Sequence, residues 1–318
     1  MFMSCGDALV DLFSQSNDSS DDTGQVMLSG MVGGSPLNVA VGLARMGNKA
    51  AFLCKNSTDF IGQDIKRYLE ANNVDTSWLV PTDLNSTLAL IQTREDGSAN
   101  YAFYTDNSAD VSLQINELPD TLPDELAVIS FGSYSTALDP TRTALTALAQ
   151  RETSKRIIAY DPNLRIGVQP DLDIWRESYS QFAATANFIK ASDEDIETLH
   201  GDGYALDHFA ADAISAGAQL VVVTQGSKGA TLYASGGASA RSNPVSVNVI
   251  DTVGAGDTFH CACLHYLGAK QHIKGLTLDA DTVDLQAMVD FAAQAAGITC
   301  SRKGADLPTL KDLPALSI

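Results

Sequence analysis

The chain has 318 residues, a formal net charge of −19 and a sequence pI near 4.4. So acidic a chain argues against nucleic acid or an anionic membrane surface as a partner, and no apolar run approaches membrane-spanning length. Five cysteines, an odd number at scattered positions, indicate reduced thiols. Because Asp7 and Asp11 lie in the first apolar stretch and no basic leader precedes them, we expect a cytoplasmic protein.

The first predicted helix covers residues 33–47. Ser35 is a suitable N-cap, Pro36 fits the first turn, and Gly47 lies just past the last helical residue. The preceding polar stretch, Ser14–Gln25, is rich in Asp and Ser and is expected to form a mobile loop.

Three segments near the N-terminus have the pattern of β-strands. Two of them alternate in two-residue steps on either side of an Asp-Gly pair at 96–97, which predicts a hairpin. The predicted strands are Val26–Val32, Ser86–Thr93 and Ala99–Thr105.

From residue 127 onward, short apolar runs alternate with helix-like stretches such as residues 139–151. The runs are Ala127–Phe131, Arg156–Tyr160, Phe188–Lys190 and Leu220–Thr224. Alternation of this kind predicts an α/β fold with a mostly parallel sheet flanked by helices.

The most informative segment is residues 250–259, which follow a β-branched run, Val245–Val249, expected to be a strand. Gly254, Ala255 and Gly256 are small, so their amides can point at one anion at the start of a helix. Asp257 then places a carboxylate beside this anion hole, which is useful if it accepts a proton from a hydroxyl that attacks phosphorus. The simpler interpretation is a Gly-rich turn capped by Asp257.

A metal site is a competing interpretation of the stretch that follows. His260, Cys261, Cys263 and His265 lie within six positions, but no single helical face presents all four. Structural zinc sites normally take two ligand pairs from separate elements, so burial of these side chains is the favoured interpretation.

These motifs together resemble those of the ribokinase/PfkB carbohydrate kinases. The matching runs occur in the family's order and span nearly the whole chain: Gly33–Ala40, Asp161–Arg165, Thr224–Gly229, Asp251–Phe259 and Arg302–Ala305. Phe103-Tyr104, Ser108–Asp110 and Lys190–Glu194 look most like the fructokinase branch. The resemblance implies a ribokinase-like α/β core over residues 1–11, 33–83 and 111–318. It also implies a small β-sheet lid over the sugar site, formed by residues 12–32 and 84–110.

The resemblance also implies a sugar site. Asp11 matches the family's sugar-binding acid, Gly33 and Gly34 let the backbone approach the sugar, and Asn38 adds its amide. Arg165 is expected to face the sugar or the transferred phosphate.

For the nucleotide, the resemblance implies a loop that contains Thr224, Gly226 and Gly229. Lys190 and Ser192 lie where the fructokinase branch contacts phosphate or magnesium.

Two metal sites are implied. Asp195 stands where the family usually carries Glu, so a bridging water or Glu194 could serve magnesium instead. Asp251 matches the carboxylate of a monovalent-cation site, with potassium as the candidate ion, that carbonyls near Ser301 and Gly304 would complete.

The sequence therefore predicts a kinase that uses ATP and Mg²⁺ to phosphorylate a hydroxyl of a free hexose, with D-fructose preferred. The alternatives are a 2-keto-3-deoxygluconate kinase, another ketose or nucleoside kinase of the same family, or a catalytically silent sugar-sensing protein. A sugar-phosphate acceptor is disfavoured because no additional basic residues flank Gly33–Asn38. Motifs of Walker-type ATPases, nicotinamide dehydrogenases and Ser hydrolases are absent. A lid with one buried face suggests a homodimer.

Overall fold

The computed structural model describes residues 1–14, 26–93, 99–242, 245–275 and 277–316. Its main sheet contains ten strands: β1 (Phe2–Cys5), β4 (Ala50–Ser57), β5 (Val74–Asp75), β6 (Leu79–Thr82), β9 (Val128–Gly132), β10 (Ile157–Asp161), β11 (Phe188–Ser192), β12 (Leu220–Thr224), β13 (Ala230–Ala234) and β14 (Ser239–Ser242). The strand order is β14-β13-β12-β11-β10-β9-β1-β4-β5, with β6 beside β4. Neighbours from β12 to β5 are parallel, whereas β13 and β14 are antiparallel.

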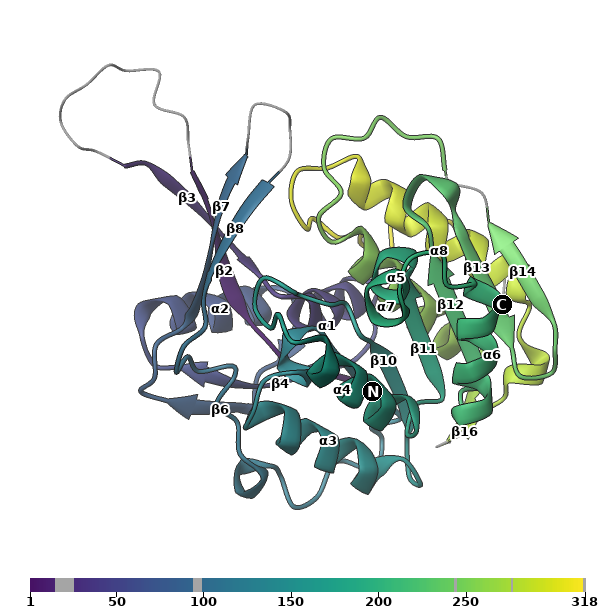
Figure 1. The fold of residues 1–318 in the computed structure, drawn as a ribbon, viewed down its shortest axis with the longest axis horizontal. Coiled ribbons are helices and arrows are strands. Elements are labelled where there is room, and N and C mark those ends of the chain that lie inside the picture. Colours follow the sequence, from purple (N-terminus) through teal and green to yellow (C-terminus); the bar gives the residue numbers. More distant parts are fainter. Residues whose placement is uncertain (15–25, 94–98, 243–244, 276, 317–318) are drawn as a thin grey trace.

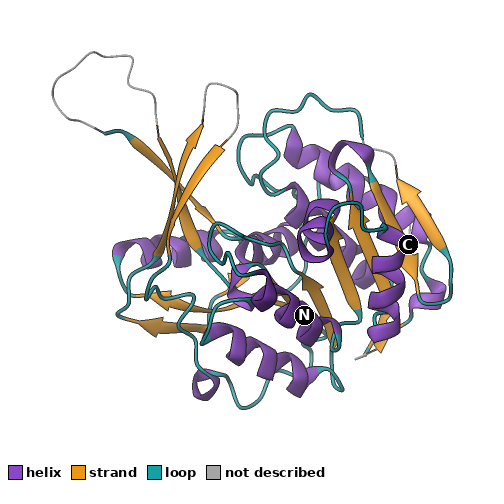
Figure 2. Ribbon diagram, in the orientation of Figure 1, coloured by secondary structure: helices purple, strands orange, loops and turns teal. Residues whose placement is uncertain are grey.

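Helices cover both faces of this sheet (Figure 2). One face packs against α1 (Ser35–Arg45), α2 (Phe60–Ala71), α7 (Ala255–Ala269) and α8 (Leu285–Cys300). The other packs against α3 (Thr141–Glu152), α4 (Leu172–Ala183), α5 (Asp193–His200) and α6 (Leu206–Ala216). Successive strand residues such as Phe2 and Met3 enter opposite cores, because side chains alternate across a strand. A sheet buried on both faces explains the continuous apolar runs in the sequence, and the predicted α/β architecture is confirmed.

A second, four-stranded sheet projects from one edge of the core (Figure 1). It contains β2 (Leu9–Ser14), β3 (Leu28–Gly33), β7 (Thr87–Thr93) and β8 (Ala99–Tyr104), in the order β3-β2-β7-β8. We call these four strands the lid. The lid already starts at Leu9, rather than at residue 12, because β2 pairs with β3 and β7 from that residue onward. A separate pair, β15 (Ile273–Lys274) and β16 (Thr277–Leu278), lies near α8 in sequence.

Two local predictions are wrong. The N-cap of α1 is Gly34, not Ser35, and no side chain caps this helix, since the Ser35 hydroxyl is used elsewhere. Residues 245–249 form no strand, although their composition is β-branched. Val245 and Val247 instead lie against Gly297 of α8, and the next residue along, Ile250, donates its amide to the Cys300 carbonyl.

Most other predicted elements are present, with ends shifted by a few residues. The predicted strand Val26–Val32, for example, is β3 at Leu28–Gly33. Most of the predicted loop Ser14–Gln25, and the hairpin turn at 94–97, lie outside the described residues. Within the described part of the chain, no helix has the length and apolar character needed to cross a membrane.

Candidate active site

The N-terminal turn of α7 forms the floor of the candidate site. Gly254 is its N-cap, in the left-handed region at φ 78° and ψ 0°. A Cβ at this position would lie 2.8 Å from Cβ of Ala305, so both the backbone conformation and the close packing require glycine. The first amides of a helix have no acceptor within the helix, and here the Ala255 amide donates to the Thr252 carbonyl at 3.2 Å. The predicted anion hole of Gly254, Ala255 and Gly256 therefore lies at a helix N-terminus, where the helix dipole attracts anions.

Asp257 lies in the first turn of α7, is 6% exposed and has donors on both carboxylate oxygens. Ser35 Oγ donates to Oδ1 at 2.6 Å, and Asn38 Nδ2 donates to Oδ2 at 2.8 Å. Asn163 Nδ2 in turn donates to Ser35 Oγ at 2.6 Å. An ionised carboxylate only accepts hydrogen bonds, and these two donors fix the orientation of both Asp257 oxygens.

A cavity of about 370 Å³ is connected to Asp257 through Asn38, which lines the cavity and donates to this carboxylate. Three of the predicted sugar-binding residues line it: Asp11 from β2, Gly33 from β3 and Asn38 from α1. A Cβ at position 33 would lie 2.7 Å from Oδ2 of Asp11, so a larger residue there would displace this carboxylate. Burial raises the pKa of Asp11 to about 6, and the positive charge of Arg165 opposes this rise.

A basic residue that the sequence motifs did not assign to the site, Arg45, also lines this cavity. Arg45 lies about two turns of α1 beyond Asn38, yet it lines the same cavity. Its Nη1 lies 2.8 Å from Oδ1 of Asp306, so its charge is paired. The cavity therefore does not present Arg45 as an isolated cation.

Arg165 belongs to the loop after β10. It does not line the 370 Å³ cavity but contacts neighbouring residues of the site. Its Nη1 donates to Oδ1 of Asn163 at 2.6 Å and to the Leu164 carbonyl at 3.0 Å. Asn163 thereby connects Arg165 with the Ser35 hydroxyl. The sequence pointed to Arg165 within Asp161–Arg165 but missed Asn163 and Ser35. Both residues could have been found from their positions within the matched runs Gly33–Ala40 and Asp161–Arg165.

Lys190 lies beneath the anion hole and is 3% exposed. Its Nζ is 2.8 Å from Oδ2 of Asp161 and would be 3.1 Å from a Cβ built on Gly256. Burial opposes the charge on Lys190, but the carboxylates of Asp161 and Asp195 outweigh it and raise the pKa of Lys190. The Lys190 ammonium, paired with Asp161, therefore lies directly behind the first turn of α7.

Ser192 and Asp195 form the N-terminal cap of α5. Ser192 Oγ donates to Oδ2 of Asp195 at 2.7 Å, and the Leu164 amide donates to Oδ1 at 2.9 Å. Asp195 thus ties α5 to the loop that carries Arg165. A magnesium role for Asp195 stays a prediction, as does the substitute role of Glu194.

The predicted nucleotide residues lie at the carboxyl edge of the parallel strands. Ser192 ends β11 and pairs in register with Thr224, which ends β12. Gly226 and Gly229 follow in a short turn before β13. Ligands of open α/β sheets bind outside this edge, so the position suits a nucleotide, although contact with one stays a prediction.

Asp251 lies at the foot of the anion-hole loop. Its Oδ1 accepts the Val253 amide at 3.1 Å, and its Oδ2 accepts the Gly304 amide at 2.8 Å. These bonds hold the loop against the segment after α8, and the remaining lone pairs suit a cation.

The alternative zinc constellation does not form. Among the described residues, no three His, Cys, Asp or Glu side chains converge as a metal site. His260, Cys261 and Cys263 are fully buried in α7, and Nε2 of His260 lies 2.9 Å from the Ser130 hydroxyl.

Comparison with known proteins gives consistent matches. Residues 2–312 match the family described as pfkB family carbohydrate kinase. A fructokinase of Rhizobium leguminosarum bv. trifolii is 35% identical over 272 residues, 83% of this chain and 78% of the relative. Probable fructokinase-7 of Arabidopsis thaliana is 32% identical over 288 residues, 89% of this chain and 82% of the relative. An uncharacterized sugar kinase from Pyrococcus horikoshii, solved in complex with ATP, is 26% identical with a TM-score of 0.81, covering 98% of this chain and 97% of that chain.

Proposed function

The chain belongs to the pfkB family of carbohydrate kinases, and we propose that it transfers the γ-phosphoryl group of ATP to a hydroxyl of free D-fructose. The observation that carries this proposal is Asp257, a buried carboxylate that accepts hydrogen bonds from Ser35 and Asn38 beside a helix N-terminus. The similar fructokinases of Rhizobium leguminosarum bv. trifolii and Arabidopsis thaliana support fructose as the acceptor.

Asp257 acts as the general base of the proposed reaction. It accepts the proton of the attacking sugar hydroxyl, while Ser35 and Asn38 hold both oxygens in place. The first-turn amides of α7 stabilise the negative charge on the transferred phosphoryl group, and buried Lys190 adds positive potential behind them. The base and the anion site are thus rigidly placed on one helix turn, which favours an in-line geometry.

The cavity lined by Asp11, Gly33 and Asn38 holds the sugar in this proposal. Carboxylate and amide oxygens can each accept bonds from neighbouring hydroxyls of a neutral sugar. An ionised Asp11 repels an acidic sugar such as 2-keto-3-deoxygluconate, and the charge of Arg45 is already paired with Asp306. Both features favour an uncharged acceptor.

ATP is proposed to bind across the carboxyl edge of the sheet near Ser192, Thr224, Gly226 and Gly229. The Pyrococcus horikoshii sugar kinase, which is solved with ATP, supports this nucleotide. Because the described residues form no cluster of three metal-capable side chains, Mg²⁺ would arrive mainly through the ATP phosphates. Mg²⁺ held there would neutralise charge on the phosphate oxygens, and Asp195 would orient its water shell. Asp251 would hold a potassium ion.

The assembly and location are further parts of the proposal. Large apolar side chains are exposed at the lid and just before it, including Val26, Leu28 and Tyr104, which are 75%, 41% and 60% exposed. A homodimer through the lid would cover them. The acidic composition and the reduced cysteines fit a cytoplasmic enzyme.

A panel of free sugars, with ADP release as the readout, tests the function. We expect D-fructose to give the highest kcat/KM, above 2-keto-3-deoxygluconate, other ketoses, nucleosides and fructose phosphates. A higher kcat/KM with any of these would replace fructose as the acceptor. If no sugar stimulates ADP release but a sugar still binds in calorimetry, the chain is a sugar sensor.

A further inference from the structure

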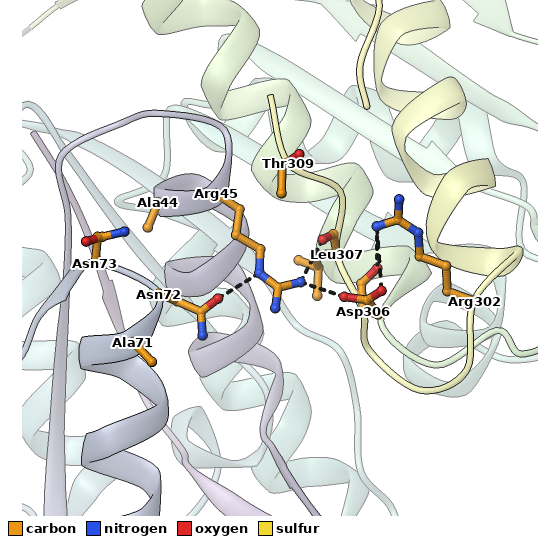
Figure 3. Close-up of a pocket in the computed structure, with 9 residues that line it drawn as sticks. All are labelled: Ala44, Arg45, Ala71, Asn72, Asn73, Arg302, Asp306, Leu307 and Thr309. Atoms are coloured by element: carbon orange, nitrogen blue, oxygen red, sulfur yellow. Dashed lines mark hydrogen bonds and ion pairs between the residues drawn. The ribbon is translucent and has the colours of Figure 1, made fainter. Parts of the chain in front are cut away.

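Arg45 joins three segments that are far apart in the sequence (Figure 3). It ends α1, and its Nε donates to Oδ1 of Asn72, at the end of α2, at 2.8 Å. Its Nη1 donates to the Leu307 carbonyl at 2.7 Å and to Oδ1 of Asp306 at 2.8 Å. These residues line a second cavity, of about 720 Å³, on whose other side Arg302 also contacts Asp306. The side chain of Arg45 therefore fixes the segment 302–307 to α1.

The same segment forms the back of the anion hole. The Gly304 amide donates to Oδ2 of Asp251 at 2.8 Å. Ala305 packs so tightly against Gly254 that a Cβ on Gly254 would come within 2.8 Å of its own. A shift of residues 304–305 would therefore move Gly254, the N-cap whose neighbours supply the first-turn amides.

The opposite end of α1 holds the base. Ser35 and Asn38 contact Asp257, and Arg45 lies ten residues after Ser35, about 15 Å along the helix axis. Helix α1 thus contacts Asp257 at its N-terminal end and the segment 302–307 at its C-terminal end.

We propose that Arg45 is a positioning residue for phosphoryl transfer, which sets the first-turn amides of α7 relative to Asp257 by clamping residues 302–307 to α1. This inference rests on the proposed kinase function. Arg45 also lines the proposed sugar cavity, but its guanidinium is engaged by Asn72, Asp306 and Leu307. It therefore acts on the reaction through the 302–307 segment and Gly254.

The geometry of the contacts requires arginine rather than any cation. Two nitrogens of one planar guanidinium serve three acceptors: an amide oxygen, a carbonyl and a carboxylate. A lysine ammonium is a compact point charge on a flexible stem and cannot reproduce this fork. Arg302 does not replace the clamp, because it reaches Asp306 at 3.6 Å and lies on the same segment as that residue.

Steady-state kinetics of Arg45→Gln, Arg45→Lys and Asp306→Asn provide the first test. We expect both Arg45 variants to lose roughly tenfold in kcat with a smaller change in the KM for sugar, since misplacement by about 1 Å can cost up to 10²-fold. Asp306→Asn should lose less, because the bond to the Leu307 carbonyl remains. Arg142→Gln is the matched control: Arg142 is 18% exposed against 20% for Arg45, bonds two acceptors from other residues, and lies on α3. We expect wild-type kinetics from it.

Hydrogen exchange without substrates provides the second test. Arg45→Gln should speed amide exchange in residues 302–307 and 253–258, and Arg142→Gln should not. Wild-type kcat in Arg45→Gln, or full rescue by lysine, would overturn the inference. If Arg45→Gln does not fold, the kinetics and hydrogen exchange of Arg45→Lys and Asp306→Asn test the inference instead. Absence of sugar-dependent turnover in the wild-type enzyme would refute the kinase function instead, while hydrogen exchange would still report the clamp.

Discussion

Asn38 donates its side-chain amide to Oδ2 of Asp257 at 2.8 Å, although the two residues are 219 positions apart in the chain. Asn38 also lines the cavity that contains Asp11. One side chain thus touches both the candidate base and the proposed sugar site, so sugar binding and base positioning are physically coupled.

Replacement of Asp257 by Asn tests the general base. Because Asn keeps the size of Asp but cannot accept the proton, we expect Asp257→Asn to fold and bind ATP. Sugar-dependent ADP production should fall by at least about 10²-fold. Ser35→Ala, which removes one donor but keeps the carboxylate, is the milder comparison. Near wild-type turnover in Asp257→Asn would show that another group accepts the proton.

Asn38→Asp is expected to change the pH dependence of turnover. A second carboxylate beside Asp257 disfavours ionisation of both groups together, so the pair loses its last proton at a higher pH than a single carboxylate would. The acid limb of the pH–kcat profile should therefore move to higher pH, with Asn38→Leu as the uncharged control. The two variants would have the same profile if Asn38 served only to fill space.

Asp7 is expected to destabilise the protein at alkaline pH. It is 1% exposed, its Oδ1 accepts the Ser135 amide at 3.3 Å, and its Oδ2 has no partner among the described residues. Burial and the nearby Asp110 carboxylate raise the pKa of Asp7 from 3.8 to about 7. The folded state therefore holds a proton that the unfolded chain releases, and stability is lost as pH rises from about 4 through 7.

Asp7→Asn should remove this loss, because its side chain is neutral at every pH. In denaturant unfolding, we expect the variant to be more stable than the wild type at pH 8 by at least about 1 kcal/mol, with a smaller difference at pH 5. Asp110→Asn is the contrast, since Asp110 is equally buried but accepts bonds from Thr87, Ser108 and Tyr134. It should be destabilised. An equal effect of Asp7→Asn at both pH values would exclude the protonation argument.

Potassium is expected to activate the enzyme through Asp251. That carboxylate holds the anion-hole loop against Gly304, so a bound cation would stiffen the amides that face the phosphate. Replacing a bulky organic cation by potassium at constant ionic strength should raise kcat. Asp251→Ala should lose both basal activity and the response. Identical rates in the two buffers would rule out this role.

Sugar, rather than ATP, is expected to close the lid. Asp11 lies in β2, where it pairs with Met31 and Ala89 of the two neighbouring lid strands, and its side chain lines the sugar cavity. Closure would exclude water that competes with the sugar hydroxyl. Hydrogen exchange in residues 87–93 and 99–104 should slow with fructose and much less with a nonhydrolysable ATP analogue. Equal protection by the analogue alone would contradict this coupling.

Much of the fold was predictable because its signals are local. The apolar runs from residue 127 onward predicted parallel strands covered by helices, since strands buried on both faces must be apolar throughout. The segment Gly254–Asp257 predicted the start of a helix with a carboxylate in its first turn, and α7 begins there. The anion hole at this helix start stays a prediction. Local signals failed at Val245–Val249, where β-branched residues pack against α8 rather than in a sheet.

The contacts of the site depended on tertiary structure. The hydroxyl of Ser35 suited an N-cap equally well, and only the packing of α1 against α7 directs it to Asp257. Arg45 could have been an ordinary charge at a helix end, but the return of the chain after α8 brings Asp306 and Leu307 within its reach. Sequence by itself determined which groups could do the chemistry. Which of them meet was decided by the burial of distant apolar faces against one another, a long-range effect that no local pattern contains.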